Sequence, residues 1–149
     1  MTTEKNVQPA LTQRESHRHF VTVNLRYADT DRQGHVNNAV FATFLESGRV
    51  SILYAPGNPA APDGASFVLA KLMLDFLAEV HWPGEVTVGT TVLRLGQSSV
   101  TIGQGIFVNE TCVATAETVI VLIDETTRKS RPMPEATRNK LGKYSPQPA

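Results

Sequence analysis

The sequence predicts a single α+β domain in which one long helix packs on a layer of antiparallel strands. After Asn37, apolar residues recur at intervals of three and four as far as residue 52, which gives one apolar helical stripe. Residues 85–124 form runs rich in Val, Thr and Ile, and Gly, Ser and Asn separate these runs as they do in hairpins. A helix packed on one face of strands joined by hairpins is an α+β layer fold.

Length, charge and composition narrow the class of protein. The 149 residues are 41% hydrophobic, which suits one domain with a sizeable core. The formal net charge is zero, so we expect no nucleic-acid partner and no membrane partner. The single cysteine, Cys112, excludes an internal disulfide and is expected to be a buried core thiol. The sequence has neither a long uncharged apolar run nor the apolar core of a signal peptide, so a cytoplasmic location is expected.

The N-terminal part predicts a tail, a strand and a turn. Residues 1–18 are polar and aperiodic, so we expect a flexible tail before a domain at 19–143, with a second tail at 144–149. Apolar and polar residues alternate over 21–27, which is the period of a half-buried strand. Asp and Gly over 29–34 then predict a turn, because they supply local hydrogen bonds and unusual backbone angles.

A helix is expected over residues 38–54, with Asn37 as its N-cap. Its first turn carries free backbone N–H groups and the positive end of the helix dipole, which can hold a developing oxyanion. Asp31 lies on the turn that leads to this helix end, so a carboxylate and an oxyanion site are expected to be neighbours. Glu46 and Arg49 lie three residues apart and predict an ion pair on the helix, with a supporting role behind the site or at an interface as the alternative.

The segment 66–82 follows a loop rich in Pro and Gly and supports two interpretations. Apolar residues alternate from Val68 to Val80, as in a strand. Charged residues at intervals of four, with helix formers between them, favour a helix instead.

The remaining chain predicts strands and a short helix. Strands are expected at 85–95, 100–108 and 111–124, and a helix at 135–143. In the middle strand, Gly103 and Gly105 share one face and permit close approach of another part of the backbone. Ala114 and Ala116 leave room in the last strand where the long helix must cross the sheet.

Two motifs point to a family. Residues 29–38 read D-x-D-x-x-G-H-V-N-N, and residues 44–49 read F-x-E-x-x-R. With these motifs the chain resembles the 4-hydroxybenzoyl-CoA thioesterase family of the hotdog fold, over about residues 20–141. The resemblance implies a hotdog fold, in which an antiparallel sheet of about five strands wraps around the long helix. It also implies that 66–82 is a strand.

The resemblance implies a chemistry as well. Asp31 is the expected catalytic carboxylate, and the backbone N–H of Asn38 is expected to polarise the thioester carbonyl. Asp31 would act either as a nucleophile that forms a mixed anhydride or as a general base on water, and both roles stay open. His35 is the third catalytic candidate, for positioning the substrate or the turn. Phe41 stands where many family members have Tyr, which removes any contact through a hydroxyl.

Substrate contacts and partners follow from the same resemblance. The expected substrate-binding residues are Gly34, Asn37, Phe41, Arg128 and Lys129. Arg128 and Lys129, together with Arg131, could contact the phosphates of coenzyme A, but a solvated charge run is the preferred interpretation. The expected partners are an acyl-CoA substrate and further copies of the chain, in a homodimer or dimer-of-dimers tetramer with active sites at the dimer interface. No cofactor is expected, since water is the second substrate.

We expect no metal site from the sequence. The turn begins like an EF-hand loop, but Val40 stands where that loop needs a bidentate Glu. Asp29, Asp31 and His35 offer close ligands with no partner cluster elsewhere in the sequence.

The sequence therefore predicts an acyl-CoA thioesterase. The alternative is a non-catalytic module of the same fold that binds acyl-CoA or acyl-carrier protein and tolerates the loss of Asp31. A hotdog hydratase or dehydratase fits less well, because the active sites of those enzymes typically place a catalytic His beside an Asp or Glu in a different arrangement.

Overall fold

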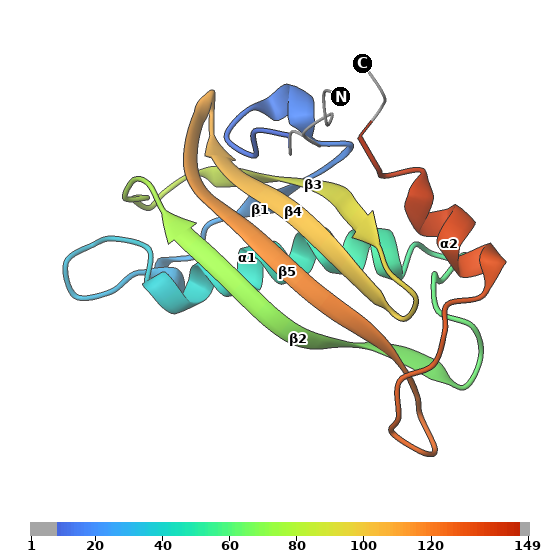
Figure 1. Ribbon diagram of the computed structural model, residues 1–149. Coiled ribbons are helices and arrows are strands. Elements are labelled where there is room, and N and C mark those ends of the chain that lie inside the picture. Colours follow the sequence, from blue (N-terminus) through green and yellow to red (C-terminus); the bar gives the residue numbers. More distant parts are fainter. Residues whose placement is uncertain (1–8, 147–149) are drawn as a thin grey trace.

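The computed structural model describes residues 9–146, which form a five-stranded antiparallel sheet packed against one long helix (Figure 1). The elements in chain order are η1 (Arg14–Ser16), β1 (His19–Asn24), η2 (Tyr27–Asp29), α1 (Asn38–Leu53), β2 (Ala65–Phe76), β3 (Glu85–Leu95), β4 (Ser99–Val108), β5 (Thr111–Asp124) and α2 (Glu135–Gly142). The strand order is β1-β3-β4-β5-β2, and α1 lies across β1, β3 and β4. The predicted hotdog fold is confirmed. No helix within residues 9–146 is both long enough and apolar enough to cross a membrane.

The central strands place small residues where α1 crosses the sheet. Val88 of β3 lies opposite Ile106 of β4, and Ile106 lies opposite Ala114 of β5. Ala114 and Ala116 are almost fully buried in the same cluster as Phe44 of α1. Their short side chains leave space for the larger side chains of the helix, as the sequence predicts.

β1 ends at Asn24, whereas the alternation predicted a strand as far as residue 27. The N–H of Leu25 donates to the carbonyl of Gly84, 2.9 Å away. The N–H of Arg26 then donates to the Asp29 carboxylate at 2.8 Å, which closes η2. A side chain thus replaces the next strand as the hydrogen-bond partner of the backbone, and the ladder stops.

The ambiguous segment is a strand, as the resemblance implied. β2 pairs with β5 from Ala65 opposite Asp124 to Phe76 opposite Ala114. Pairing along this length overrides the helix propensity of the segment. The strand is shorter than expected and ends at Phe76, because the next N–H, that of Leu77, donates to the carbonyl of Val113 and the chain then leaves the sheet.

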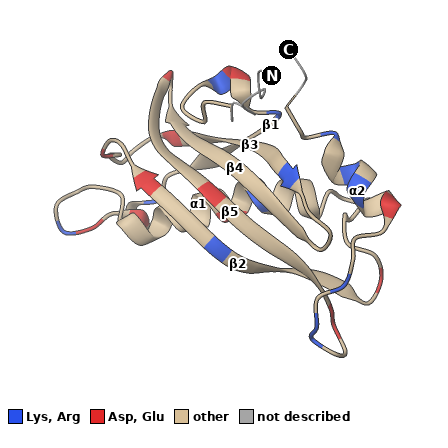
Figure 2. Cartoon of the chain, viewed as in Figure 1, with Lys and Arg blue, Asp and Glu red and all other residues tan. Residues whose placement is uncertain are grey.

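Within the described residues, β2 pairs only with β5 and forms an edge of the sheet. Its Leu69, Met73 and Phe76 side chains are about half exposed, at 54%, 49% and 50%. Charged side chains are sparse along the strands and gather in the connecting segments and α2 (Figure 2). A long apolar edge of this kind favours pairing with another strand.

Residues 9–18 pack on the sheet, so this part of the predicted tail is structured, while residues 1–8 lie outside the described residues. His17 is 5% exposed. A Cβ added at Gly105 would lie 2.6 Å from the carbonyl oxygen of Leu11, and one at Gly103 would lie 2.7 Å from the Leu11 side chain. The glycines of β4 therefore permit the close approach predicted for them, and the approaching segment is the N-terminal one.

The second predicted tail also contacts the sheet as far as it is described. The carbonyl of Tyr144 accepts a hydrogen bond from the N–H of Val92 at 2.9 Å, and residues 147–149 lie outside the described residues. Cys112, expected to be buried, is only half-buried, and its thiol lies 3.3 Å from the carbonyl oxygen of Ala114. Burial raises the pKa of this thiol, so it stays protonated and is a poor nucleophile.

Candidate active site

Residues 29–37, hereafter the Asp31 turn, form a closed loop before α1. Thr30 and Val36 pair as an antiparallel bridge at its neck. Inside the loop, the N–H of Asp31 donates to the carbonyl of His35 at 2.7 Å, and the N–H of Gly34 donates to the carbonyl of Asp31 at 3.1 Å. Gly34 has φ of +83°, a conformation that residues with a Cβ rarely adopt. The loop is thus held by its own backbone.

Two carboxylates of this turn have opposite environments. Asp29 is 2% exposed, and both of its oxygens accept hydrogen bonds from Arg26, including the guanidinium at 2.7 Å. These hydrogen bonds lower the pKa of Asp29. Asp31 is exposed, and its Oδ1 accepts from the N–H groups of Gln33 at 2.8 Å and His35 at 3.2 Å. Its Oδ2 accepts no hydrogen bond from residues 9–146, so Asp31 is oriented yet keeps a free oxygen.

The start of α1 is capped as predicted. The side-chain oxygen of Asn37 accepts from the N–H of Ala39 at 3.0 Å, and its carbonyl accepts from the N–H of Val40 at 2.9 Å. Immediately before these two N–H groups, the N–H of Asn38 has no hydrogen-bond partner within residues 9–146. A free N–H at the positive end of a helix is suited to donate a hydrogen bond to a carbonyl oxygen on which charge develops.

A cleft of about 400 Å³ joins the Asp31 turn to the end of β2. Its lining residues are Asp31, Gln33, His35, Val36, Asn38, Phe41, Phe76, Leu77, Ala78 and Glu79. The rings of Phe41 and Phe76 meet edge to face with centroids 5.1 Å apart. The cleft lining therefore combines a carboxylate and a helix start with two packed aromatic rings.

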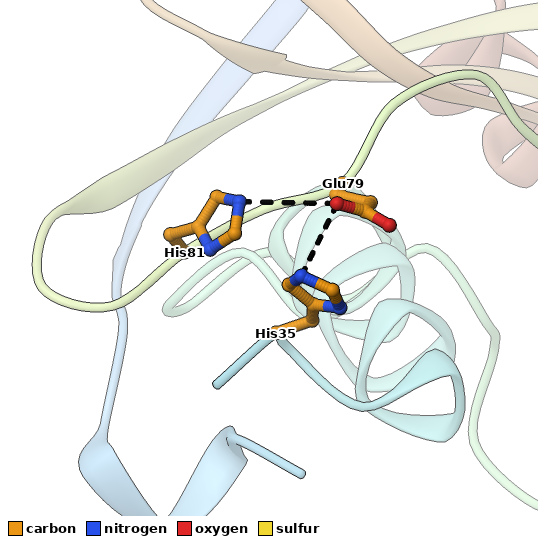
Figure 3. Close-up of side chains that lie close together, drawn as sticks. All are labelled: His35, Glu79 and His81. Carbon is orange, nitrogen blue, oxygen red and sulfur yellow. Dashed lines mark ion pairs between the residues drawn. The ribbon is translucent and has the colours of Figure 1, made fainter. Parts of the chain in front are cut away.

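His35 is held by residues that the sequence analysis did not connect to the site. Its Nε2 lies 3.2 Å from a carboxylate oxygen of Glu79, and the Nε2 of His81 lies 3.9 Å from the same oxygen (Figure 3). His35 meets Asp31 through its backbone N–H and not through its ring. Glu79 and His81 alternate with buried Val80, and this period was the signal that they share one face.

The predicted substrate-binding residues divide into three groups. Phe41 lines the cleft, while Gly34 and Asn37 shape the turn and its cap without lining it. Arg128 and Lys129 lie in the turn after β5, at the opposite end of β2 from the cleft (Figure 1). A strand of this length spans roughly 35 Å, so one chain does not bring these cations to Asp31.

The predicted ion pair of Glu46 with Arg49 is wrong. Glu46 is exposed, whereas Arg49 is 7% exposed on the side of α1 that faces the sheet. The Nη1 of Arg49 donates to Oε1 of Gln104 at 3.4 Å. Burial lowers the pKa of the Arg49 guanidinium, and the charge of Glu46 opposes this only in part. Arg49 lies four residues after Leu45 and three before Ile52, so the helical stripe itself turns it inward.

Gln104 is the buried residue that the sequence analysis missed. Its Nε2 donates to the carbonyl of Leu45 at 2.9 Å and to Oγ1 of Thr90 at 3.0 Å. A Cβ added at Gly48 would lie 2.6 Å from this Nε2. We call Gly48, Arg49, Thr90 and Gln104 the helix anchor. The signal in the sequence was a lone amide between Ile102 and Ile106 on the apolar face of β4.

Comparison with known proteins gives one family. The sequence pattern of the thioesterase-like superfamily matches residues 25–141. Among solved structures, a thioesterase from Thermus thermophilus, complexed with coenzyme A and Zn, is 29% identical with a TM-score of 0.78, over 91% of this chain and 99% of that chain.

Two further structures share the fold at lower identity. A protein from Pseudomonas aeruginosa strain PAO1 is 24% identical with a TM-score of 0.83, over 93% of this chain and 99% of that chain. The DHNA-CoA thioesterase from Staphylococcus aureus is 23% identical with a TM-score of 0.69, over 76% of this chain and 78% of that chain.

Proposed function

Because this chain belongs to the thioesterase-like superfamily, we propose that it is an acyl-CoA thioesterase that uses Asp31. One observation carries the proposal. A single cleft is lined both by the oriented, partly free carboxylate of Asp31 and by Asn38, whose N–H is free at the start of α1. A relative with bound coenzyme A supports a CoA-type ligand.

The proposed reaction follows from these groups. The thioester carbonyl oxygen accepts a hydrogen bond from the N–H of Asn38, which stabilises the charge that develops on it. Asp31 then either attacks the carbonyl carbon, forming an anhydride as the thiolate leaves, or takes a proton from the water that attacks. In the first route, water cleaves the anhydride and restores the carboxylate. Both routes end in a free acid and coenzyme A.

The aromatic lining of the cleft supports an acyl group bound against rings. Phe41 and Phe76 pack together in this lining, and Phe76 is half exposed at the sheet edge. Its exposure leaves apolar surface available to an acyl chain or to a second copy of the chain.

We further propose a homodimer, in which two β2 edges pair antiparallel about a two-fold axis. The half-exposed apolar side chains of β2 support it, because isolated edges of this kind pair readily. Antiparallel pairing would bring the start of one β2 beside the end of the other. Arg128 and Lys129 of the second copy would then approach this cleft, which would give them the phosphate-binding role that one chain does not.

The test is thiol release from a panel of short, long and aromatic acyl-CoAs, with wild type, Asp31→Asn and a matched control. Glu15→Gln is the control, because it removes an exposed carboxylate from η1. This short helix belongs to the N-terminal segment and does not line the cleft. We expect Asp31→Asn to lower kcat by about 10²-fold or more and Glu15→Gln to leave it unchanged.

The other outcomes separate the alternatives. Binding of acyl-CoA without turnover by the wild type would favour the non-catalytic module. Turnover that survives Asp31→Asn would mean that Asp31 is not the catalytic carboxylate. Light scattering gives the mass in solution, and a monomer at assay concentration would contradict the dimer.

A further inference from the structure

We infer that His35, Glu79 and His81 form a binding site for a divalent metal of the zinc type, beside the cleft. The three donor atoms, one from each side chain, all lie within 4.8 Å of one another. Figure 3 shows both imidazoles directed at one carboxylate, His35 from the Asp31 turn and His81 from the segment after β2. The chain thus brings together two nitrogen donors and one oxygen donor from positions far apart in sequence.

A simple hydrogen bond does not account for the cluster. It explains the 3.2 Å contact between His35 and Glu79. It leaves the Nε2 of His81 at 3.9 Å from the same oxygen, beyond hydrogen-bond distance. The two rings meet edge to face with centroids 4.7 Å apart, so both imidazoles lie side by side next to the carboxylate.

The distances suit a tetrahedral ion. Zinc binds His nitrogen and Glu oxygen at about 2.0–2.2 Å, and two such bonds at a tetrahedral angle separate their donor atoms by about 3.3 Å. The pair of His35 and Glu79 already has this separation. His81 and Glu79 are 63% and 67% exposed in their side chains, so both can rotate to bring the donor atoms, now within 4.8 Å of one another, to this separation.

The backbone holds the ligands in place before any ion binds. His35 and His81 form an antiparallel bridge, which fixes the two chain segments side by side. Next to it, the N–H of Val36 donates to the carbonyl of Val80 at 2.7 Å. Glu79 and His81 are both exposed on either side of buried Val80 and so lie on one face of the segment. Binding of a metal ion therefore requires little additional ordering of the backbone.

The donor set selects the kind of metal. Two neutral imidazoles with one carboxylate suit zinc and similar transition metals, whereas magnesium and calcium prefer oxygen ligands alone. Three protein ligands leave a fourth position for water or another ligand. Because His35 and Glu79 also line the cleft, a bound ion would clip the Asp31 turn to the segment after β2.

The experiment measures metal binding alone, so its result is independent of the proposed function. The full chain, without a histidine tag and after treatment with a chelator, is titrated with zinc chloride by calorimetry. We expect one zinc ion per chain, with affinity lowered about tenfold or more in His81→Ala and in Glu79→Gln. Matched controls are His19→Ala and Glu110→Gln, which remove an imidazole and a 91% exposed carboxylate elsewhere and should leave the affinity unchanged.

Histidine signals provide a second readout. The chain has four histidines, so imidazole resonances can be assigned by substitution. Zinc should shift the signals of His35 and His81 and leave those of His17 and His19 in place, and magnesium should shift none. Absence of zinc binding, undiminished affinity in His81→Ala, or shifts confined to His17 and His19 would each overturn the inference.

Discussion

The Asp31 turn and the helix anchor both hold α1, yet they use polar groups in opposite ways. In the turn, hydrogen bonds run mostly within the loop backbone and leave the Asp31 Oδ2 and the Asn38 N–H free. In the anchor, Gln104 joins Arg49, Thr90 and the Leu45 carbonyl out of contact with water. The groups proposed to react therefore lie where the helix starts, and the groups that fix its position lie under its middle. Substitutions should separate the same way, with stability lost at the anchor and activity lost at the turn.

The largest effect on stability is expected from Gln104→Leu. It leaves the buried Arg49 guanidinium without its acceptor, and we expect unfolding to require about 3 kcal/mol less free energy, as for a buried charge that loses its partner. Urea unfolding of Gln104→Leu, Arg49→Met and the double variant measures it. The double variant should recover at least about 1 kcal/mol relative to the sum of the single ones. Simple additivity would show that the two side chains do not interact.

Gly48→Ala comes next, because its new methyl has no space. The Cβ would lie 2.8 Å from both Thr90 Oγ1 and Val88 Cγ1 and would displace the Gln104 amide. We expect a loss of about 2 kcal/mol despite the better helix propensity of Ala. Ser47→Ala, on the exposed side of the same turn of helix, should change stability by less than about 0.5 kcal/mol. Equal effects in the two variants would refute close packing at Gly48.

Asn37 is the last residue of the Asp31 turn and the N-cap of α1, so Asn37→Ala should affect both stability and activity. Removing the cap of Ala39 N–H should cost about 1 kcal/mol in urea unfolding. Fraying of the first turn of α1 should also lower kcat, because the Asn38 N–H loses its fixed position. A variant with the expected loss of stability but unchanged kcat would argue that the helix start takes no part in the reaction.

The smallest effect, and the one that depends on pH, is expected from Asp29→Asn. The pKa of Asp29 is lowered in the folded state by its hydrogen bonds to Arg26, so its contribution is present above the unfolded pKa of about 3.9 and is lost as pH falls through the lower folded value. Asp29→Asn should therefore be less stable than wild type at pH 7, and the difference should shrink below about pH 4. Because the Arg26 side chain is 73% exposed, added salt should also reduce the difference in stability between wild type and Asp29→Asn. If the difference in stability between wild type and Asp29→Asn did not depend on pH, its cause would be the packing of the side chain and not the charge of Asp29.

Local patterns in the sequence predicted the local parts of this structure. The helix start at Asn37, the bounds of β3 and β5 and the turn at Gly34 each depend on neighbours within a few residues, which the sequence displays directly. The strand at β2 needed the family resemblance, because its helix propensity yields only to pairing with β5. Asp31 and Asn38 were placed together correctly, since one short turn joins them.

The contacts that sequence analysis missed join residues distant in the chain. Arg49 was paired with Glu46, its neighbour on the helix, although its acceptor Gln104 lies on β4. His35 was considered without Glu79 and His81, which reach it only after β2 returns the chain to the Asp31 turn. Periodicity tells which face a residue occupies but not which residue of another strand stands opposite it.

β4 has a consequence for how the chain can change length. Gln104 faces α1, while Gly103 and Gly105 on either side of it face the N-terminal segment. Successive side chains of a strand point to opposite faces of the sheet. Deleting one residue earlier in β4 would therefore move every later side chain of the strand to the opposite face. The amide would leave its buried partners on α1, and the space occupied by Leu11 would be filled at the same time. Natural or engineered insertions and deletions are therefore expected in the loops that flank β4. Within the strand, we expect single substitutions to be tolerated mainly at its two ends.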